Sequence, residues 1–141
     1  MKLLIDTNIV LDALLKREPW DEASAAILFA VAEDKAEGYI TASTFTDMHY
    51  LIKKCLKNET QTRQILMDLL EVVSVLDVIG ADIGKAFDLP MEDYEDALLA
   101  FCAKRHKMDA IITRNLKHYA GSPVQAIQPE KALNMLKFPM I

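Results

Sequence analysis

Two polar residues stand directly behind short apolar runs of this 141-residue sequence, at points where side chains could meet to do chemistry. Asp6 follows the run 3–5, and Asn115 lies just beyond the run 110–112. A short, unbroken apolar run is typical of a strand buried on both faces, as in a parallel sheet. Parallel strands end at one sheet edge, where open α/β sheets gather ligands, so Asp6 and Asn115 can face a common crevice if these strands are neighbours. Each residue could instead only cap the helix that follows it.

A second group of acids surrounds the predicted start of a helix at Asp93. Asp93 at the N-cap and Asp96 three residues later form an acidic version of a capping box, and negative charge offsets the helix dipole there. Capping explains one of these carboxylates and could explain both. However, Asp88, Glu92 and Glu95 crowd the same segment, and so many acids repel one another unless some bind a cation. Residues 93 and 96 share a helix face, so both carboxylates can point the same way.

Asp47 lies one turn into the helix predicted after the run 39–41, and aspartate is a mediocre helix former. It is either a third member of the acidic group or a solvated surface residue. Asp109, just before the run 110–112, is expected to be a turn residue or to support the site from behind. Carboxylate and amide oxygens without a His or Cys ligand set are typical of Mg²⁺ or Mn²⁺ sites, and such ions can activate water for attack on a phosphodiester. The sequence has neither a nucleophile elbow nor a glycine-rich phosphate loop.

A phosphate-containing substrate needs positive charge beside these acids. Arg114, Lys117 and His118 follow the run 110–112 on the expected ligand edge of the sheet, so they are candidate phosphate contacts. The basic run 104–107 ends a predicted helix, where it complements the C-terminal dipole away from that edge. Another basic group could be a second patch or only a solvated helix face: Lys53, Lys54 and Lys57.

Strands that alternate with helices must position these residues. We predict strands at 2–5, 39–41, 72–78, 110–113 and 125–127, and helices at 8–16, 21–33, 45–55, 81–87, 93–102, from 60 onward and from 129 onward. Gly38 is expected to close the second helix. Alternation with short connections predicts an α/β protein with a parallel sheet covered on both faces. At this length we expect one domain over residues 1–141.

The composition, with 52% apolar and 26% charged residues, is ordinary for a compact soluble protein. Every apolar run is shorter than the ~20 residues that span a bilayer, and Asp6 and Asp12 interrupt the N-terminal stretch that could have been a secretory signal. We therefore expect no membrane association and a cytoplasmic location. The net charge of −5 argues against non-specific coating of nucleic acid, but it is compatible with an enzyme that acts on it. Cys55 and Cys102 lie in apolar helical patterns and are expected to be buried thiols, and the apolar end 138–141 could dock or fray.

Three segments, taken together, resemble the PIN-domain family of Mg²⁺-dependent ribonucleases, which includes the toxins of VapC-type toxin–antitoxin pairs. They are LIDTN at 4–8, DYEDAL at 93–98 and DAIITRN at 109–115. The segments occur in the order and spacing of the family, and the resemblance covers nearly the whole chain. It implies a three-layer α/β/α sandwich around a central parallel sheet of about five strands, with acids clustered at the carboxyl edge of the sheet.

The resemblance also implies a role for each polar residue. Asp6 matches the first acid of the family, and Asp96 matches the third, with Asp93 close enough to share its work. Asp47 falls where the family often has glutamate. Asn115 falls where many members carry a fourth aspartate, and Thr113 matches the hydroxyl residue that the family has before it.

These assignments lead to the hypothesis of a Mg²⁺- or Mn²⁺-dependent endoribonuclease that hydrolyses RNA phosphodiester bonds. Asp6, Asp96 and Asp93 would hold the metal, and Asp47 and Asn115 would complete the catalytic group. The expected substrate contacts are Asn8, Thr113, Arg114 and Lys117. Family members of this type often form homodimers and are neutralised by a small antitoxin, so the resemblance implies both partners.

Two alternatives stay open. Asp47 is one methylene shorter than glutamate and Asn115 lacks a charge, so the chain could be a catalytically weak or inactive PIN-like domain that binds RNA or protein. An acid after the first strand also suggests a phospho-acceptor. Against that reading, Asn8 stands where an aspartyl phosphotransferase needs a second aspartate, and the lysine that a receiver domain needs after its last strand is missing.

Overall fold

The computed structural model describes residues 1–139, and within them a parallel five-stranded sheet forms the centre of the molecule. The strands are β1 (Lys2–Ile5), β2 (Glu37–Thr41), β3 (Ser74–Leu76), β4 (Ala110–Ile112) and β5 (Ala126–Ile127). Their order across the sheet is β3-β2-β1-β4-β5. β1 therefore lies in the middle and pairs with β4, with Leu4 opposite Ile111. This pairing brings the residues that follow β1 and β4 to the same edge, as the sequence predicts.

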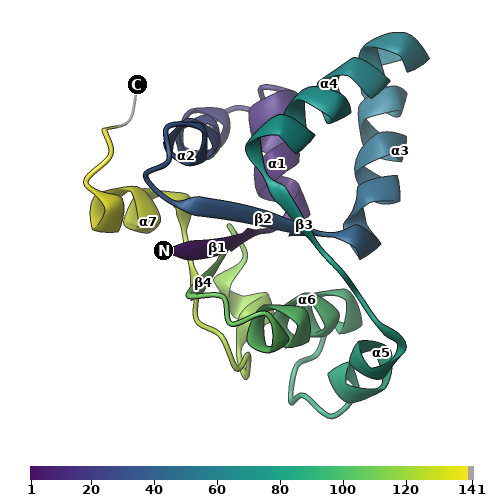
Figure 1. Cartoon of the computed structure of the whole chain (residues 1–141), viewed down its shortest axis with the longest axis vertical. Coiled ribbons are helices and arrows are strands. Elements are labelled where there is room, and N and C mark those ends of the chain that lie inside the picture. Colours follow the sequence, from purple (N-terminus) through teal and green to yellow (C-terminus); the bar gives the residue numbers. More distant parts are fainter. Residues whose placement is uncertain (140–141) are drawn as a thin grey trace.

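Seven α-helices and two 3₁₀ turns connect the strands within the described residues: α1 (Thr7–Leu14), α2 (Asp21–Ala32), η1 (Ala42–Thr44), α3 (Phe45–Leu56), α4 (Glu59–Val72), α5 (Gly80–Ala86), α6 (Tyr94–Arg105), η2 (Leu116–Tyr119) and α7 (Pro129–Leu136). Figure 1 shows α1, α2, α3 and α4 on one side of the sheet and α5 and α6 on the other. The three-layer α/β/α sandwich is thus confirmed.

The two apolar cores follow the alternation of side chains along the central strands. Leu3 and Ile5 of β1 point into a core shared with α1, α2, α3, α4 and α7. Leu4 between them points to the opposite face, where it packs in a second core that contains Leu99 of α6 and Tyr119 of η2. Because β1 is buried on both faces, its carboxyl end is a rigid support for whatever follows it.

Two predicted boundaries were wrong for local reasons. The β-branched run from Val72 predicted a strand, but Val72 is the last residue of α4 and β3 is confined to Ser74–Leu76. Gly38 was expected to close the second helix, yet it lies inside β2. A Cβ at Gly38 would stand 2.8 Å from Cγ2 of Val31, so this glycine allows α2 to pack closely against the strand.

Three residues outside the acidic group also have defined positions. Cys102 is buried as expected, but Cys55 is exposed, because it lies on a face of α3 that does not contact the core. Asp109 accepts a hydrogen bond of 2.7 Å from the backbone N–H of Lys2, at the end of the sheet where β1 begins, so it is a turn residue remote from the carboxyl edge. At the apolar end of the chain, Phe138 packs against the first core, whereas residues 140 and 141 lie outside the described part.

The helices of the described segment are too short or too polar to cross a lipid bilayer.

Candidate functional site

Asp6 occupies the turn between β1 and α1, the position where the sequence predicts the first acid. It stands at the N-cap of α1, yet its side chain makes no capping hydrogen bond to that helix in the described structure. Instead, Oδ2 accepts a hydrogen bond of 2.9 Å from Oγ1 of Thr113, which follows β4. Burial raises the pKa of Asp6, and the Thr113 hydrogen bond acts in the opposite direction. The carboxylate is therefore oriented by the neighbouring strand rather than by helix capping.

The first turn of α6 supplies two further carboxylates with different roles. Asp93 is the N-cap, and its Oδ1 accepts a hydrogen bond of 3.0 Å from the backbone N–H of Asp96. The carboxylate of Asp96 is held from the other side, because Tyr119 donates to Oδ1 at 3.3 Å and Nδ1 of His118 lies 3.2 Å from Oδ2. Asp93 thus shapes the helix start, while Asp96 points toward η2.

Asp96 is the residue of this group whose charge is least favourable. Burial, followed by the negative charges of Asp6 and then Asp93, raises the pKa of Asp96 to about 6. The hydrogen bond from Tyr119 and the positive charge of His118 only partly offset these effects. Asp6 and Asp96, separated by ninety positions in the sequence, are therefore close enough to repel each other.

These residues line one pocket of about 540 Å³. It collects most of the polar residues that the sequence singled out, namely Asp6, Asn8, Asp47, Asp93, Asp96 and Asn115. Asn115 is the N-cap of η2, and its amide makes no capping hydrogen bond to the described residues. Among the residues of the described chain that line the pocket, His118 is the only basic one. The pocket therefore carries a strong excess of negative charge.

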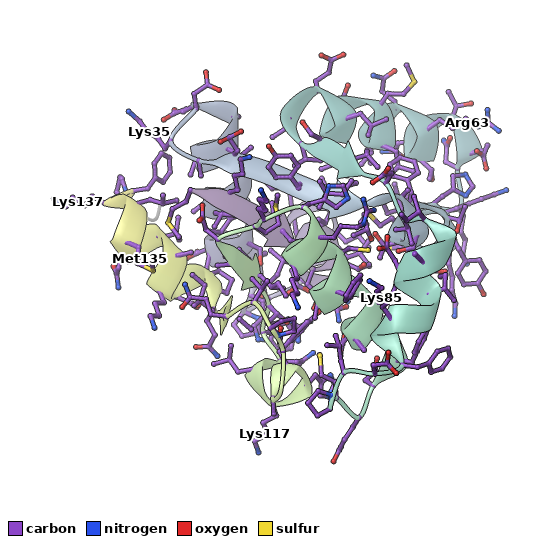
Figure 2. All side chains as sticks on the ribbon, turned by 60° about the horizontal axis from the view of Figure 1, so that its bottom comes forward. Lys35, Arg63, Lys85, Lys117, Met135 and Lys137 are labelled. Carbon is purple, nitrogen blue, oxygen red and sulfur yellow. The ribbon has the colours of Figure 1, made fainter. Side chains whose placement is uncertain are left out.

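Three of the expected substrate contacts, Thr113, Arg114 and Lys117, do not line this pocket. Thr113 is fully buried behind Asp6, so it positions the carboxylate and is shielded from a ligand. Arg114 forms hydrogen bonds of 2.7 and 3.2 Å with Asp12 of α1 and stacks 3.9 Å from the Trp20 ring, beside a separate hollow of about 180 Å³. Lys117 projects outward from η2 into solvent (Figure 2).

Several residues that line or support the pocket were not predicted to belong to the site. Tyr119 holds Asp96 from the second core. Ser43, Thr44 and Tyr50 line the opposite wall, which η1 and α3 provide. His118 had been noticed only as a phosphate contact. The spacing of Asn115 and His118 by three residues in a helical turn was the one available signal that both face the same way.

The oxygen donors of the pocket fit a hard divalent cation. Within residues 1–139, no three or more His, Cys, Asp or Glu side chains are grouped as a complete metal site. Mg²⁺ is bound in proteins by one or two carboxylates and keeps several waters, so Asp6 and Asp96 are a sufficient pair. A cation between them would also relieve the repulsion that raises the pKa of Asp96.

The arrangement of acids at the end of the central strand agrees with what sequence comparison finds, since residues 2–117 match the PIN domain family. The chain belongs to the PIN-domain family. No curated protein matches the sequence.

Solved structures confirm that the PIN fold extends over the chain. VapBC2 of Rickettsia felis, crystallised with a DNA fragment from its promoter, has a TM-score of 0.71 and 19% identity over 91% of this chain and 98% of that one. A toxin–antitoxin complex from Klebsiella pneumoniae has a TM-score of 0.65 and 24% identity, with 90% and 97% of the two chains covered. PAE2754 of Pyrobaculum aerophilum has a TM-score of 0.67 and 14% identity, with 97% and 96% covered. At these identities the similarity establishes the fold.

Proposed function

We propose that this PIN domain is a Mg²⁺- or Mn²⁺-dependent endoribonuclease that hydrolyses phosphodiester bonds in RNA. The observation that carries the proposal is the convergence of Asp6 and Asp96 in one pocket, where the negative charge of Asp6 disfavours the ionisation of Asp96. Burial of neighbouring like charges opposes folding, so a ligand that needs paired carboxylates explains their placement best. Family membership supports the same conclusion.

In this proposal the cation would be held by Asp6 and Asp96, with Asp93 beside them, and it would supply positive charge that polarises the phosphodiester and makes water a better nucleophile. The protein residues position and orient. Thr113 holds the carboxylate of Asp6, while Tyr119 and His118 hold that of Asp96. The amides of Asn8 and Asn115 lie in the pocket wall, where they can hydrogen-bond to phosphate or sugar oxygens. Asp47, on the α3 side of the pocket, can accept a hydrogen bond from water or a ribose hydroxyl.

The test is cleavage of a single-stranded RNA with Mg²⁺, with chelator, and by three variants. Asp6→Asn and Asp96→Asn should each lower the rate by at least about 100-fold, as expected when the cation that stabilises the reacting group loses a charged ligand. The matched control is Asp34→Asn, which removes the same charge from an exposed turn whose φ of 59° asparagine tolerates. Equal cleavage by Asp6→Asn and the wild type would overturn the proposal.

A second candidate, an RNA- or protein-binding PIN domain without hydrolytic activity, is favoured by the chemistry of Asp47 and Asn115. Asp47 has a shorter side chain than the glutamate that the family often has at this position. Asn115 has an amide where a further carboxylate would strengthen cation binding. Titration calorimetry separates the two candidates, because a binding-only domain would take up no Mg²⁺ at millimolar concentration.

The comparisons also support a proposal about partners. Because similar structures include toxin–antitoxin complexes, we propose that a small antitoxin binds this chain. From the family resemblance alone, we also propose that the chain forms a homodimer. Light scattering tests the homodimer. Co-purification with the product of a neighbouring gene that encodes a small DNA-binding protein tests the antitoxin.

A further inference from the structure

The outer face of α3 carries an exposed row of residues that leads away from the acidic pocket. Asp47, Tyr50 and Lys54 follow one another at intervals of three and four residues, so they share a helix face, and Lys57 is the C-cap residue just beyond the end of the helix. All four are exposed, and Tyr50 has 63% of its surface accessible. Asp47 and Tyr50 both line the pocket, so the row begins inside the candidate site.

Four other residues of α3 contact the rest of the fold. Met48 and Ile52 are fully buried in the first core. His49 and Lys53 face α4, where both pair with Glu59, at 2.9 and 3.1 Å. In contrast, Lys54 and Lys57 form no salt bridge within residues 1–139, and the hydroxyl of Tyr50 has no hydrogen-bond partner there. The helix therefore has one face that builds the fold and one face with unused binding groups.

We propose that this outer face of α3, the Tyr50–Lys57 face, binds the RNA strand next to the scissile bond. One unstacked base packs on the ring of Tyr50, and the following phosphates contact Lys54 and Lys57. At 1.5 Å per residue, Lys54 stands about 6 Å beyond Tyr50 along the helix axis, and Lys57 follows Leu56, the last residue of the helix. The inference rests on the proposed ribonuclease function and adds how the substrate is held.

The chemistry of the face favours a single nucleic acid strand over other occupants. An aromatic ring beside cations is the combination that binds single strands, because bases stack on the ring while phosphates meet the positive charges. A duplex keeps its base faces stacked and cannot use Tyr50 in this way. A protein interface of the same kind would bury two lysines, which are depleted from interface cores. The pocket itself is acidic, so positive charge farther along the strand offsets its repulsion of phosphate.

Binding is measured by fluorescence anisotropy with Mg²⁺, in the Asp6→Asn background so that the labelled strand stays intact. The probe is a single-stranded RNA, and its blunt duplex serves as the comparison. Tyr50→Ala should weaken single-strand binding by about 5- to 150-fold, the range for one lost base–aromatic stack, whereas Tyr50→Phe should retain it. The preference for the single strand over the duplex should fall with Tyr50→Ala.

The lysines are tested through the salt dependence of the same affinity. The double variant Lys54→Gln, Lys57→Gln should reduce the slope of log K against log[salt] by about 1.4, because each phosphate contact on a single strand contributes about 0.7. The control is Lys35→Gln, Lys131→Gln, which makes the same change in net charge elsewhere on the surface. Figure 2 places Lys35 at the opposite end of the molecule from Arg63 of α4. Arg63 lies close to α3, because it pairs with Glu59, the residue that also pairs with Lys53 of α3. The control slope should equal that of the parent.

The outcomes separate this inference from the proposed function. If the wild type cleaves RNA but the Tyr50 and lysine variants bind it unchanged, the binding face is overturned and the ribonuclease proposal stands. If cleavage fails while these variants lose affinity as expected, the binding face stands and hydrolysis is overturned. If Tyr50→Ala changes the oligomeric state and leaves RNA affinity intact, the face is a protein interface and the inference is wrong.

Discussion

The carboxyl group of Asp96 lies in surroundings that disfavour its charged form. Its side chain is 14% exposed and lies beside two other acids, so its charged form is disfavoured. The pKa of Asp96 in the folded protein is about 6, compared with 3.8 for an ordinary aspartate. A pKa raised by folding stabilises the folded state below the ordinary value, and this contribution is lost as the pH rises through the folded value.

We therefore predict that the metal-free protein becomes less stable between pH 4 and pH 6 by up to about 3 kcal/mol through Asp96. Asp96→Asn should remove most of this pH dependence and should be more stable than the wild type at pH 7. Urea unfolding in chelator at several pH values in this range measures both effects. Asp34→Asn is again the control, since its carboxylate lies in an exposed turn. A wild-type stability that rises over this range, with no change from Asp96→Asn, would contradict the prediction.

Residue identity alone could not have revealed this state of Asp96. The sequence places Asp93 and Asp96 on one helix face, and the structure agrees, but the neighbours that decide their roles come from other elements. Tyr119 belongs to η2 and Asp6 to the turn after β1. Capping was an open alternative for Asp6 and Asp93, and the structure divides them: Asp93 caps α6, while Asp6 is held by Thr113.

At the scale of elements, the features that could be predicted are those that follow from local sequence patterns, such as the central strands. Short apolar runs identified β1 and β4, and their shared edge followed from parallel pairing. The boundary between α4 and β3 was missed because Val72 and its neighbours favour a strand intrinsically, while packing on the first core extends the helix. The ion pair of Arg114 could not be predicted, because its partner, Asp12, lies 102 positions away and leaves no local sequence signal.

The ion pair of Arg114 and Asp12 joins α1 to the turn after β4, the two segments that carry Asp6 and Asn115. Asp12 is fully buried, so loss of Arg114 would remove both of its guanidinium hydrogen bonds and leave its charge paired only with the more distant Arg17, at 3.5 Å, among the described residues. We predict that Arg114→Ala lowers the free energy of unfolding by about 2–4 kcal/mol, somewhat less than removal of the sole partner of a buried charge would cost. Arg114→Lys should recover only part of this, because an ammonium cannot reproduce the two hydrogen bonds of the guanidinium. Urea unfolding at pH 7 measures the change.

A surface arginine provides the comparison for this element-scale prediction. Arg63 pairs with Glu59 one helical turn away, and its side chain is 72% exposed, so Arg63→Ala should change stability by less than about 1 kcal/mol. The steady-state KM for RNA, measured below the unfolding transition, distinguishes the two roles of Arg114. Should Arg114→Ala destabilise no more than Arg63→Ala and yet raise KM, Arg114 would be a substrate contact after all.

At the scale of the whole molecule, the pocket joins segments that only the complete fold brings together. Asp6 follows the central strand, Asp47 lies on α3, and Asp96 lies on α6 on the other side of the sheet. An unfolded chain cannot offer these carboxylates at one point, so a cation that uses them binds the native state alone. By linkage, such a ligand stabilises the fold by an amount set by its concentration relative to Kd.

We predict that Mg²⁺ at about 100 times its Kd raises the free energy of unfolding by about 2.7 kcal/mol. Asp6→Asn and Asp96→Asn should lose this gain, and Asp34→Asn should keep it. Thermal and urea unfolding measure the gain against sodium chloride of equal ionic strength, because screening alone also reduces repulsion among the acids. The two site variants should differ from the control in this way, since the charge removed is the same in all three. If Mg²⁺ stabilised all of them equally, the cation would be bound elsewhere on this acidic surface, and the convergence of Asp6 and Asp96 would need another explanation.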